Sequence, residues 1–331
     1  MVIKKIQALS LSVIGSFVCL NSVQADMLDN AAEIAKSQFY FDVNAGVWLV
    51  NWDQVSTASS KFGSDAISTD YAIEMAPAAA LSAKIGFTEF FTSKFEYVET
   101  QDDTGKKLSK YAGALGFFIN DFTFYSQLYQ GKFHGSLSGI KTTAGTSEFG
   151  SGTFETNLNL TDFVIFYKNI GLGYRDFKYE LPQDLYLVSA ANPSSVIASG
   201  FEEIKYSGNF AMVAYDSNLG NALEAGWNLA LYAGMGDLKP SGKFLEDLNA
   251  NATISAANEG KSIMNNGQAY FIEGNLAYQW VYKRIGIDWG INAGYKYSKL
   301  AATFDNNANY ALVTDFETTL NGPFVELTGE F

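Results

Sequence analysis

The segment IGIDWGINAGYKYSK at residues 285–299 alternates between two kinds of side chain. Isoleucine, tryptophan, alanine and tyrosine occupy every second position, and the positions between them hold glycine or polar residues. Successive side chains of a β-strand point to opposite faces, so this pattern predicts a strand with one apolar and one polar face. Residues 204–216, 224–236 and 268–280 repeat it. We therefore expect a sheet whose two surfaces differ in chemistry.

The alternation does not by itself decide where the apolar surface points. A soluble β-sandwich or lipocalin-like barrel, with its apolar face inward, has the same period. Glycine dominates the polar face of residues 285–298, which favours a crowded, concave polar side. Aromatic residues gather at strand ends as they do at membrane interfaces, in the pairs Tyr278 with Trp280, Tyr295 with Tyr297, and Trp48 with Trp52. The residues that we assign to lipid include Tyr206, Phe210, Met212, Trp227, Leu229, Ile287, Ile291 and Leu327.

Composition supports a membrane barrel. Only 17% of the residues are charged, below the ~25% usual for soluble domains, and 15% are aromatic. No stretch of the mature chain is apolar for the ~18 residues that a transmembrane helix needs. Backbone groups in lipid must be hydrogen-bonded internally, which a closed β-barrel achieves. The net charge of −13 argues against nucleic acid, and no phosphate-binding loop, cofactor motif or metal cluster is found.

The fold class that we predict is all-β, a closed antiparallel transmembrane barrel of about twelve strands in one domain, residues 39–331. Short connections alternate with long ones, as periplasmic turns alternate with extracellular loops. We expect Pro323 to lie where its strand has an unpaired N–H, and a β-bulge within residues 161–181, whose faces cannot be assigned. The predicted strands are 39–52, 73–87, 91–101, 109–119, 122–133, 153–168, 171–181, 204–216, 224–236, 268–280, 285–300 and 310–331.

The amino-terminal residues 1–25 have the pattern of a secretory signal peptide. Lys4 and Lys5 precede an apolar run, and small residues stand before Asp26, where the mature chain would begin. The single cysteine, Cys19, lies within this segment. Residues 26–38 are predicted to form a short periplasmic helix or a leader ahead of the barrel.

Together these features resemble bacterial outer-membrane β-barrel proteins. In that class the last strand commonly ends in an aromatic residue that the barrel assembly machinery recognises. Here Val325, Leu327 and Phe331 match that signal, and Gly329 departs from its commonest form. The resemblance implies location in the outer membrane, with membrane lipid, lipopolysaccharide and the assembly machinery as partners, and it allows a homo-oligomer.

The first functional hypothesis is a porin-like channel for passive passage of small solutes or ions. Pairing the hairpin around residues 281–284 would place Glu273 opposite about Asn292 and near Asp288, which predicts a weak cation preference. The inward, pore-lining candidates are Lys84, Lys205, Glu273, Asn275, Asp288, Asn292, Lys296 and Glu326.

The second hypothesis is an esterase built on the only histidine. His134 and Ser136 share one face of a strand, and Glu148 would return on the neighbouring strand to orient the imidazole. This arrangement resembles that of lipid A 3-O-deacylases and outer-membrane phospholipase A, although the third member in the phospholipase is an asparagine. The glycine-rich flanks predict a loop instead, so we do not assign catalytic residues.

A third hypothesis is a surface or adhesion barrel that acts through its long loops. Residues 182–203 and 237–267 are rich in serine, asparagine and alanine. Residues 304–309 carry oxygen-bearing side chains but lack the spacing of a calcium loop.

Overall fold

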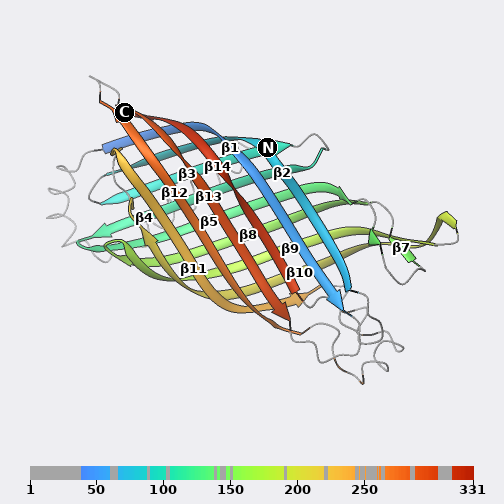
Figure 1. Cartoon of the computed structure of the whole chain (residues 1–331). Helices are drawn as coiled ribbons and strands as arrows, with labels where there is room; N and C mark the ends of the chain where they lie inside the picture. Colours follow the sequence, from blue (N-terminus) through green and yellow to red (C-terminus); the bar gives the residue numbers. More distant parts are fainter. Residues whose placement is uncertain are drawn as a thin grey trace, which may run out of the picture.

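The computed structural model of the chain describes twelve long β-strands (Figure 1). It covers residues 39–59, 66–87, 90–101, 105–137, 140–141, 147–149, 152–189, 192–219, 223–242, 265–283, 288–304 and 315–331, and the single positions 246, 250, 259 and 261. The long strands are β1 (Phe39–Ser59), β2 (Ala66–Phe87), β3 (Phe91–Gln101), β4 (Lys107–Ile119), β5 (Phe122–Leu137), β8 (Gly152–Tyr167), β9 (Ile170–Ser189), β10 (Asn192–Asp216), β11 (Gly226–Ser241), β12 (Gly267–Tyr282), β13 (Asp288–Phe304) and β14 (Asp315–Glu330).

These strands form one closed antiparallel barrel. Each pairs with the next long strand along the chain, and β14 pairs with β1 to complete the ring. Two short strands, β6 (Ile140–Lys141) and β7 (Ser147–Phe149), extend the sheet beside β9. The predicted fold class and strand number are confirmed. Among the described residues, no helix is long and apolar enough to span a membrane. The predicted signal peptide and the segment 26–38 lie outside the described residues.

Short turns gather at one end of the barrel. Two-residue turns join Ile119 to Phe122 and Tyr167 to Ile170, and their first residues, Asn120 and Lys168, adopt positive φ. This is the conformation that tight hairpins require at that position. We call the end that carries these turns and Phe331 the turn end, and the opposite end the loop end.

In the half nearer the turn end, the outer surface is apolar. Trp227 is 68% exposed, and Ile291 and Leu327 are also exposed, as predicted for lipid-facing residues. Leu229 is partly exposed on the same strand as Trp227, and Ile287 lies outside the described residues. An outward apolar band around a closed barrel is the surface that a lipid bilayer requires.

Toward the loop end, the polarity of the two faces reverses. On β9, Lys178 is exposed and forms an ion pair with Asp176, at 3.1 Å between nitrogen and oxygen, while Phe177 and Tyr179 are buried inside. On β10, Asn209 is exposed and Phe210 is buried. The strands therefore have a polar exterior and an apolar interior at this end, as in a soluble protein.

Two predicted face assignments are wrong for this reason. Trp48 and Trp52 are not interfacial; both are buried within the barrel. Their indole N–H groups donate to the Gly322 carbonyl at 3.1 Å and to Thr318 Oγ1 at 3.2 Å. Hydrogen-bonded N–H groups are expected of tryptophans that are buried away from water.

The face assignment of β10 is also reversed. Tyr206, Phe210 and Met212 are buried inside, not exposed to lipid. Lys205 belongs to the outer face, where its ammonium lies 3.6 Å from a Glu180 oxygen. Near the turn end this strand is apolar on both faces, because exposed Val213 lies beside buried Met212, so alternation gives no signal there.

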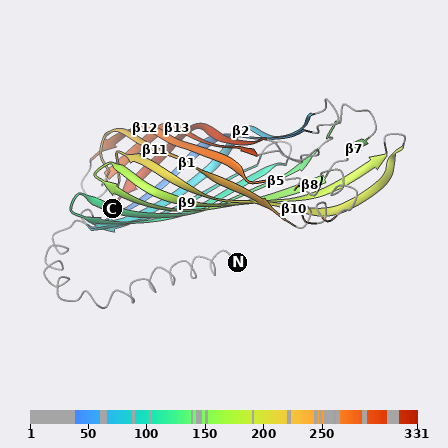
Figure 2. The same cartoon turned by 90° about the horizontal axis from the view of Figure 1, so that it is seen from below.

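Three local predictions also differ from the structure. Residues 182–203, expected to be a loop, extend β9 and β10 into a hairpin that projects past the other strands (Figure 2). The β8–β9 register has no shift from Asn157 opposite Glu180 to Tyr167 opposite Ile170, and a register shift lies instead between Val50 and Trp52 on β1. Glu273 pairs with Ser298 rather than with about Asn292, because β12 continues through Tyr282 before it turns.

The seam between β1 and β14 has one interruption. Trp48 pairs with Phe324 and Asn51 with Asn321, while Pro323 and Gly322 have no partner on β1. Pro323 therefore lies where its strand needs no donor on that side, as predicted. Gly322 has φ of +151°, and a Cβ there would lie 1.7 Å from the Leu49 carbonyl oxygen.

We predict that Gly322→Ala destabilises the barrel, because the added methyl meets backbone that cannot move without opening the seam. The expected loss is about 2 kcal/mol or more of unfolding free energy, measured by urea titration of the refolded protein. Gly329→Ala on the same strand is the matched control, since its Cβ would have no neighbour closer than 3.5 Å. Equal stability of the two variants would contradict this account of the seam.

Candidate functional site

Two cavities lie within the barrel. The larger has a volume of about 340 Å³ and reaches from the middle of the barrel toward the aromatic side chains of the loop end. The smaller, of about 230 Å³, lies toward the turn end. They share lining residues and therefore adjoin along the lumen; the shared residues are Lys94, Ala114, Tyr125, Asp216, Ala230, Asn275, Asn292 and Glu326.

Aromatic side chains cross the lumen at the loop end of the larger cavity. Trp52 of β1 stacks on Phe133 of β5, with ring centroids 4.2 Å apart. Tyr179 of β9 donates a hydrogen bond to Gln54 of β1, although these two strands stand on opposite sides of the barrel. Tyr206 stacks on Phe316 at 5.2 Å. We call Trp52, Gln54, Phe133, Tyr179, Tyr206 and Phe316 the loop-end layer.

Described residues of the β10–β11 connection line the smaller cavity at its turn end. Leu219 and Leu223 line this cavity, and Leu223 is buried. The Leu223 N–H donates to a Glu330 carboxylate oxygen at 2.7 Å, and the Asn218 N–H donates to Asp216 at 2.9 Å. These contacts hold the two leucines, which we call the turn-end floor, against the barrel wall.

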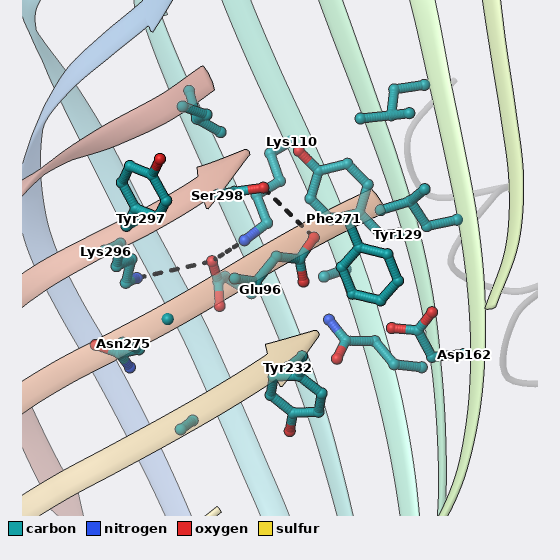
Figure 3. Close-up of a pocket in the computed structure, with 18 of the residues that line it drawn as sticks. Glu96, Lys110, Tyr129, Asp162, Tyr232, Phe271, Asn275, Lys296, Tyr297 and Ser298 are labelled. Carbon is teal, nitrogen blue, oxygen red and sulfur yellow. Dashed lines mark hydrogen bonds and ion pairs between the residues drawn. The ribbon is translucent and has the colours of Figure 1, made fainter. Parts of the chain in front are cut away.

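Three lysines surround one carboxylate in the larger cavity. The ammonium groups of Lys110, Lys94 and Lys296 lie 2.8, 3.3 and 3.9 Å from Glu96 oxygens. Lys296 also lies 3.3 Å from Glu326. Figure 3 shows Lys110 and Lys296 reaching Glu96 from different strands. We call Lys94, Glu96, Lys110 and Lys296 the lysine cluster.

A second ionic group surrounds Arg175, which is 4% exposed. Its guanidinium donates two hydrogen bonds of 2.7 Å to Asp162 and two of 2.6 and 2.8 Å to Glu273. It also lies 4.0 Å from the centroid of the Phe271 ring. The guanidinium is thus hydrogen-bonded to both carboxylates. This geometry offsets the free-energy cost of removing its charge from water.

The predicted pore-lining residues divide into three groups. Lys205 lies on the outer face, and Asp288 stands on the inward-facing set of β13 positions near the turn end without lining either cavity. Those that line a cavity are Lys84, Glu273, Asn275, Asn292, Lys296 and Glu326.

Sequence reasoning missed Lys94, Glu96, Lys110, Asp162 and Arg175. Lys94 and Glu96 stand two positions apart on β3, and Lys110 lies diagonally across from Glu96 on β4. The alternation within these strands could therefore have placed all three side chains on the same face. Asp162 and Arg175 fall where the faces could not be assigned.

The basis for the predicted cation preference does not hold. Glu273 is paired with Arg175, and it is not near Asp288 because its register partner is Ser298. The two ionic groups and Glu326 together contain four cationic side chains and four carboxylates, so their formal charges cancel.

The predicted esterase arrangement is not formed by the strands. His134 is exposed on the outer face and pairs with Glu155 of β8 and Lys107 of β4. Glu148 lies on β7, which pairs with β9 and not with β5. On the neighbouring strand, the residue opposite His134 is Glu155 and not Glu148.

Comparison with known proteins finds no matching protein-family model and no matching curated protein. Solved structures of similar shape include a Pseudomonas aeruginosa FadL homologue, with 9% identity, TM-score 0.30, and coverage of 89% of this chain and 90% of that chain. The Pseudomonas putida toluene transporter TodX has 10% identity, TM-score 0.31, and coverage of 88% and 89%. The Escherichia coli outer-membrane protease OmpT has 8% identity, TM-score 0.31, and coverage of 89% and 98%. The overall likeness is weak, and strand register establishes the barrel independently.

We predict that Arg175→Met strongly destabilises the protein, because it leaves buried Asp162 without its cation. A loss of about 3–5 kcal/mol is expected from urea unfolding. Lys178→Met on the same strand removes an exposed ion pair and should cost about 1 kcal/mol or less. Adding Asp162→Asn to Arg175→Met should recover part of the loss; no recovery would show that packing, and not charge, makes Arg175 important.

Proposed function

We propose that this chain is an outer-membrane channel for small solutes whose lumen is closed at both ends in the state described. The observation that carries this proposal is the pair of adjoining cavities along the barrel axis. The larger falls within the ~300–1,000 Å³ range of small-molecule sites in proteins. A barrel that served only as a membrane anchor would not need cavities of this size lined by ionic groups.

The apolar outer band supports the location in the outer membrane. On the closing strand, Val325, Leu327 and Phe331 are exposed in an outward row, where membrane lipid and the barrel assembly machinery would engage them. Phe331 is fixed in place because its backbone exchanges hydrogen bonds of 2.9 and 3.3 Å with Phe41. The closing aromatic residue is thus both paired to the first strand and accessible from outside.

The closures at the two ends determine how such a channel would conduct. The loop-end layer and the turn-end floor are arranged in series along one lumen. Opening either one alone leaves the other in the path. We therefore expect low basal conductance, with passage depending on rearrangement of both closures.

We predict that combining Trp52→Ala and Tyr179→Ala with Leu223→Ala raises conductance in planar bilayers several-fold above that of the native barrel. The loop-end pair alone, or Leu223→Ala alone, should raise it much less. Trp227→Ala removes an equally large aromatic side chain from the lipid face and is the matched control. Heat-modifiable gel mobility verifies that each variant is folded; a folded triple variant that conducts no more than the native barrel would overturn the channel proposal.

A further inference from the structure

We infer that the larger cavity is a binding site for a small organic anion with an apolar body, received by the lysine cluster. The inference names a substrate class for the proposed channel and rests on that proposal for its role in transport. Binding itself can be measured without transport.

The lysine cluster has more donors than its carboxylates can accept. Each ammonium carries three N–H groups. The contacts of the three lysines with carboxylates number four, three of them to Glu96 and one to Glu326. These contacts use fewer N–H groups than the three ammoniums carry, so donors are left over although the formal charges of the two ionic groups and Glu326 cancel. The side chain of Lys94 is 47% exposed, and this residue lines both cavities. Its ammonium is therefore accessible from the lumen.

The wall beside these lysines is apolar and aromatic. The Lys296 ammonium lies 4.6 Å from the Phe324 ring centroid and 5.6 Å from that of Trp48, and Lys110 lies 5.2 Å from Tyr129. Trp52, Phe133 and two leucines continue the same wall toward the loop end; the leucines are Leu158 and Leu160. A ligand with its anionic group on the lysines would place its body against this wall.

The other ionic group does not compete for such a ligand. Asp162 and Glu273 have their oxygens occupied by four hydrogen bonds from Arg175, and Ser298 donates a further one to Glu273 at 3.4 Å. Their carboxylates thus offer little to an incoming cation, whereas the lysine cluster retains donors for an anion. A cationic ligand could not accept hydrogen bonds from the ammonium groups, and an apolar neutral one would leave their remaining donors unused.

The test is isothermal titration calorimetry of the full chain refolded in detergent micelles. The probes are 4-phenylbutyrate, 4-phenylbutanol and 4-phenylbutylamine, which share an apolar body and differ in charge. We expect 4-phenylbutyrate to bind at least about tenfold more tightly than the other two. Lys94→Gln should weaken its binding about tenfold, and Glu96→Gln should strengthen it by removing the competing carboxylate.

Lys178→Gln is the matched control, because Lys178 is exposed on the outer face of β9, where it pairs with Asp176 at 3.1 Å, and it lines neither cavity. It should leave 4-phenylbutyrate binding unchanged. The uncharged 4-phenylbutanol, which has the same apolar body, serves to measure partition into the micelle. Equal affinity for the three probes, or equal effects of Lys94→Gln and Lys178→Gln, would overturn the anion site. If the expected pattern is found but the triple variant described above does not conduct, the channel proposal fails and the anion site stands.

Discussion

The surroundings of the outer surface change along every strand of this barrel, and that change sets the chemistry of the inner surface as well. Where the outside is apolar, as at Trp227 and Leu327, the inward positions of the same strands hold Asn228 and Glu326. Where the outside carries Lys178 and Asn209, the inward neighbours are Phe177 and Phe210. A strand has only two faces, so each must bury its apolar side where water is excluded. Lipid provides that place near the turn end, and the lumen provides it near the loop end.

A ring of twelve strands is narrow enough for inward side chains to meet across it. Tyr179 reaches Gln54 from the opposite wall, and Arg175 reaches Glu273 three strands away. Ionisable groups within this space must be paired, since an isolated charge there would lose its hydration. Removing one partner would therefore leave an unpaired buried charge, and under the proposed function these groups would select among solutes. The lysine cluster differs from the Arg175 group only in having donors left over.

Alternation predicted the strands well because the period of two persists whichever face is apolar. It predicted the faces of β11 to β14 near the turn end, where Trp227, Ile291 and Leu327 have polar inward neighbours. It could not predict β10, where Met212 and Val213 are both apolar. Nor could it find the partner of Glu273, because Arg175 stands 98 positions away and cross-lumen contacts leave no local pattern. The register of the β12–β13 hairpin was missed because Val281 and Tyr282 continue the strand instead of forming the turn.

The two closures of the lumen differ in what must break for a solute to pass. The loop-end layer is built from side chains of paired strands, and buried rings such as Trp52 and Phe133 stack on each other where they line the larger cavity. Moving them opens a core that holds several strands together. The turn-end floor belongs to a connection, and the Leu223 hydrogen bond to Glu330 is not part of any strand ladder. Breaking this hydrogen bond would therefore leave every strand pair intact, whereas the proposed passage at the loop end requires rings carried by the strands to separate. A ligand that packs against Trp48 and Trp52 would replace some of the contacts that this layer loses when it opens.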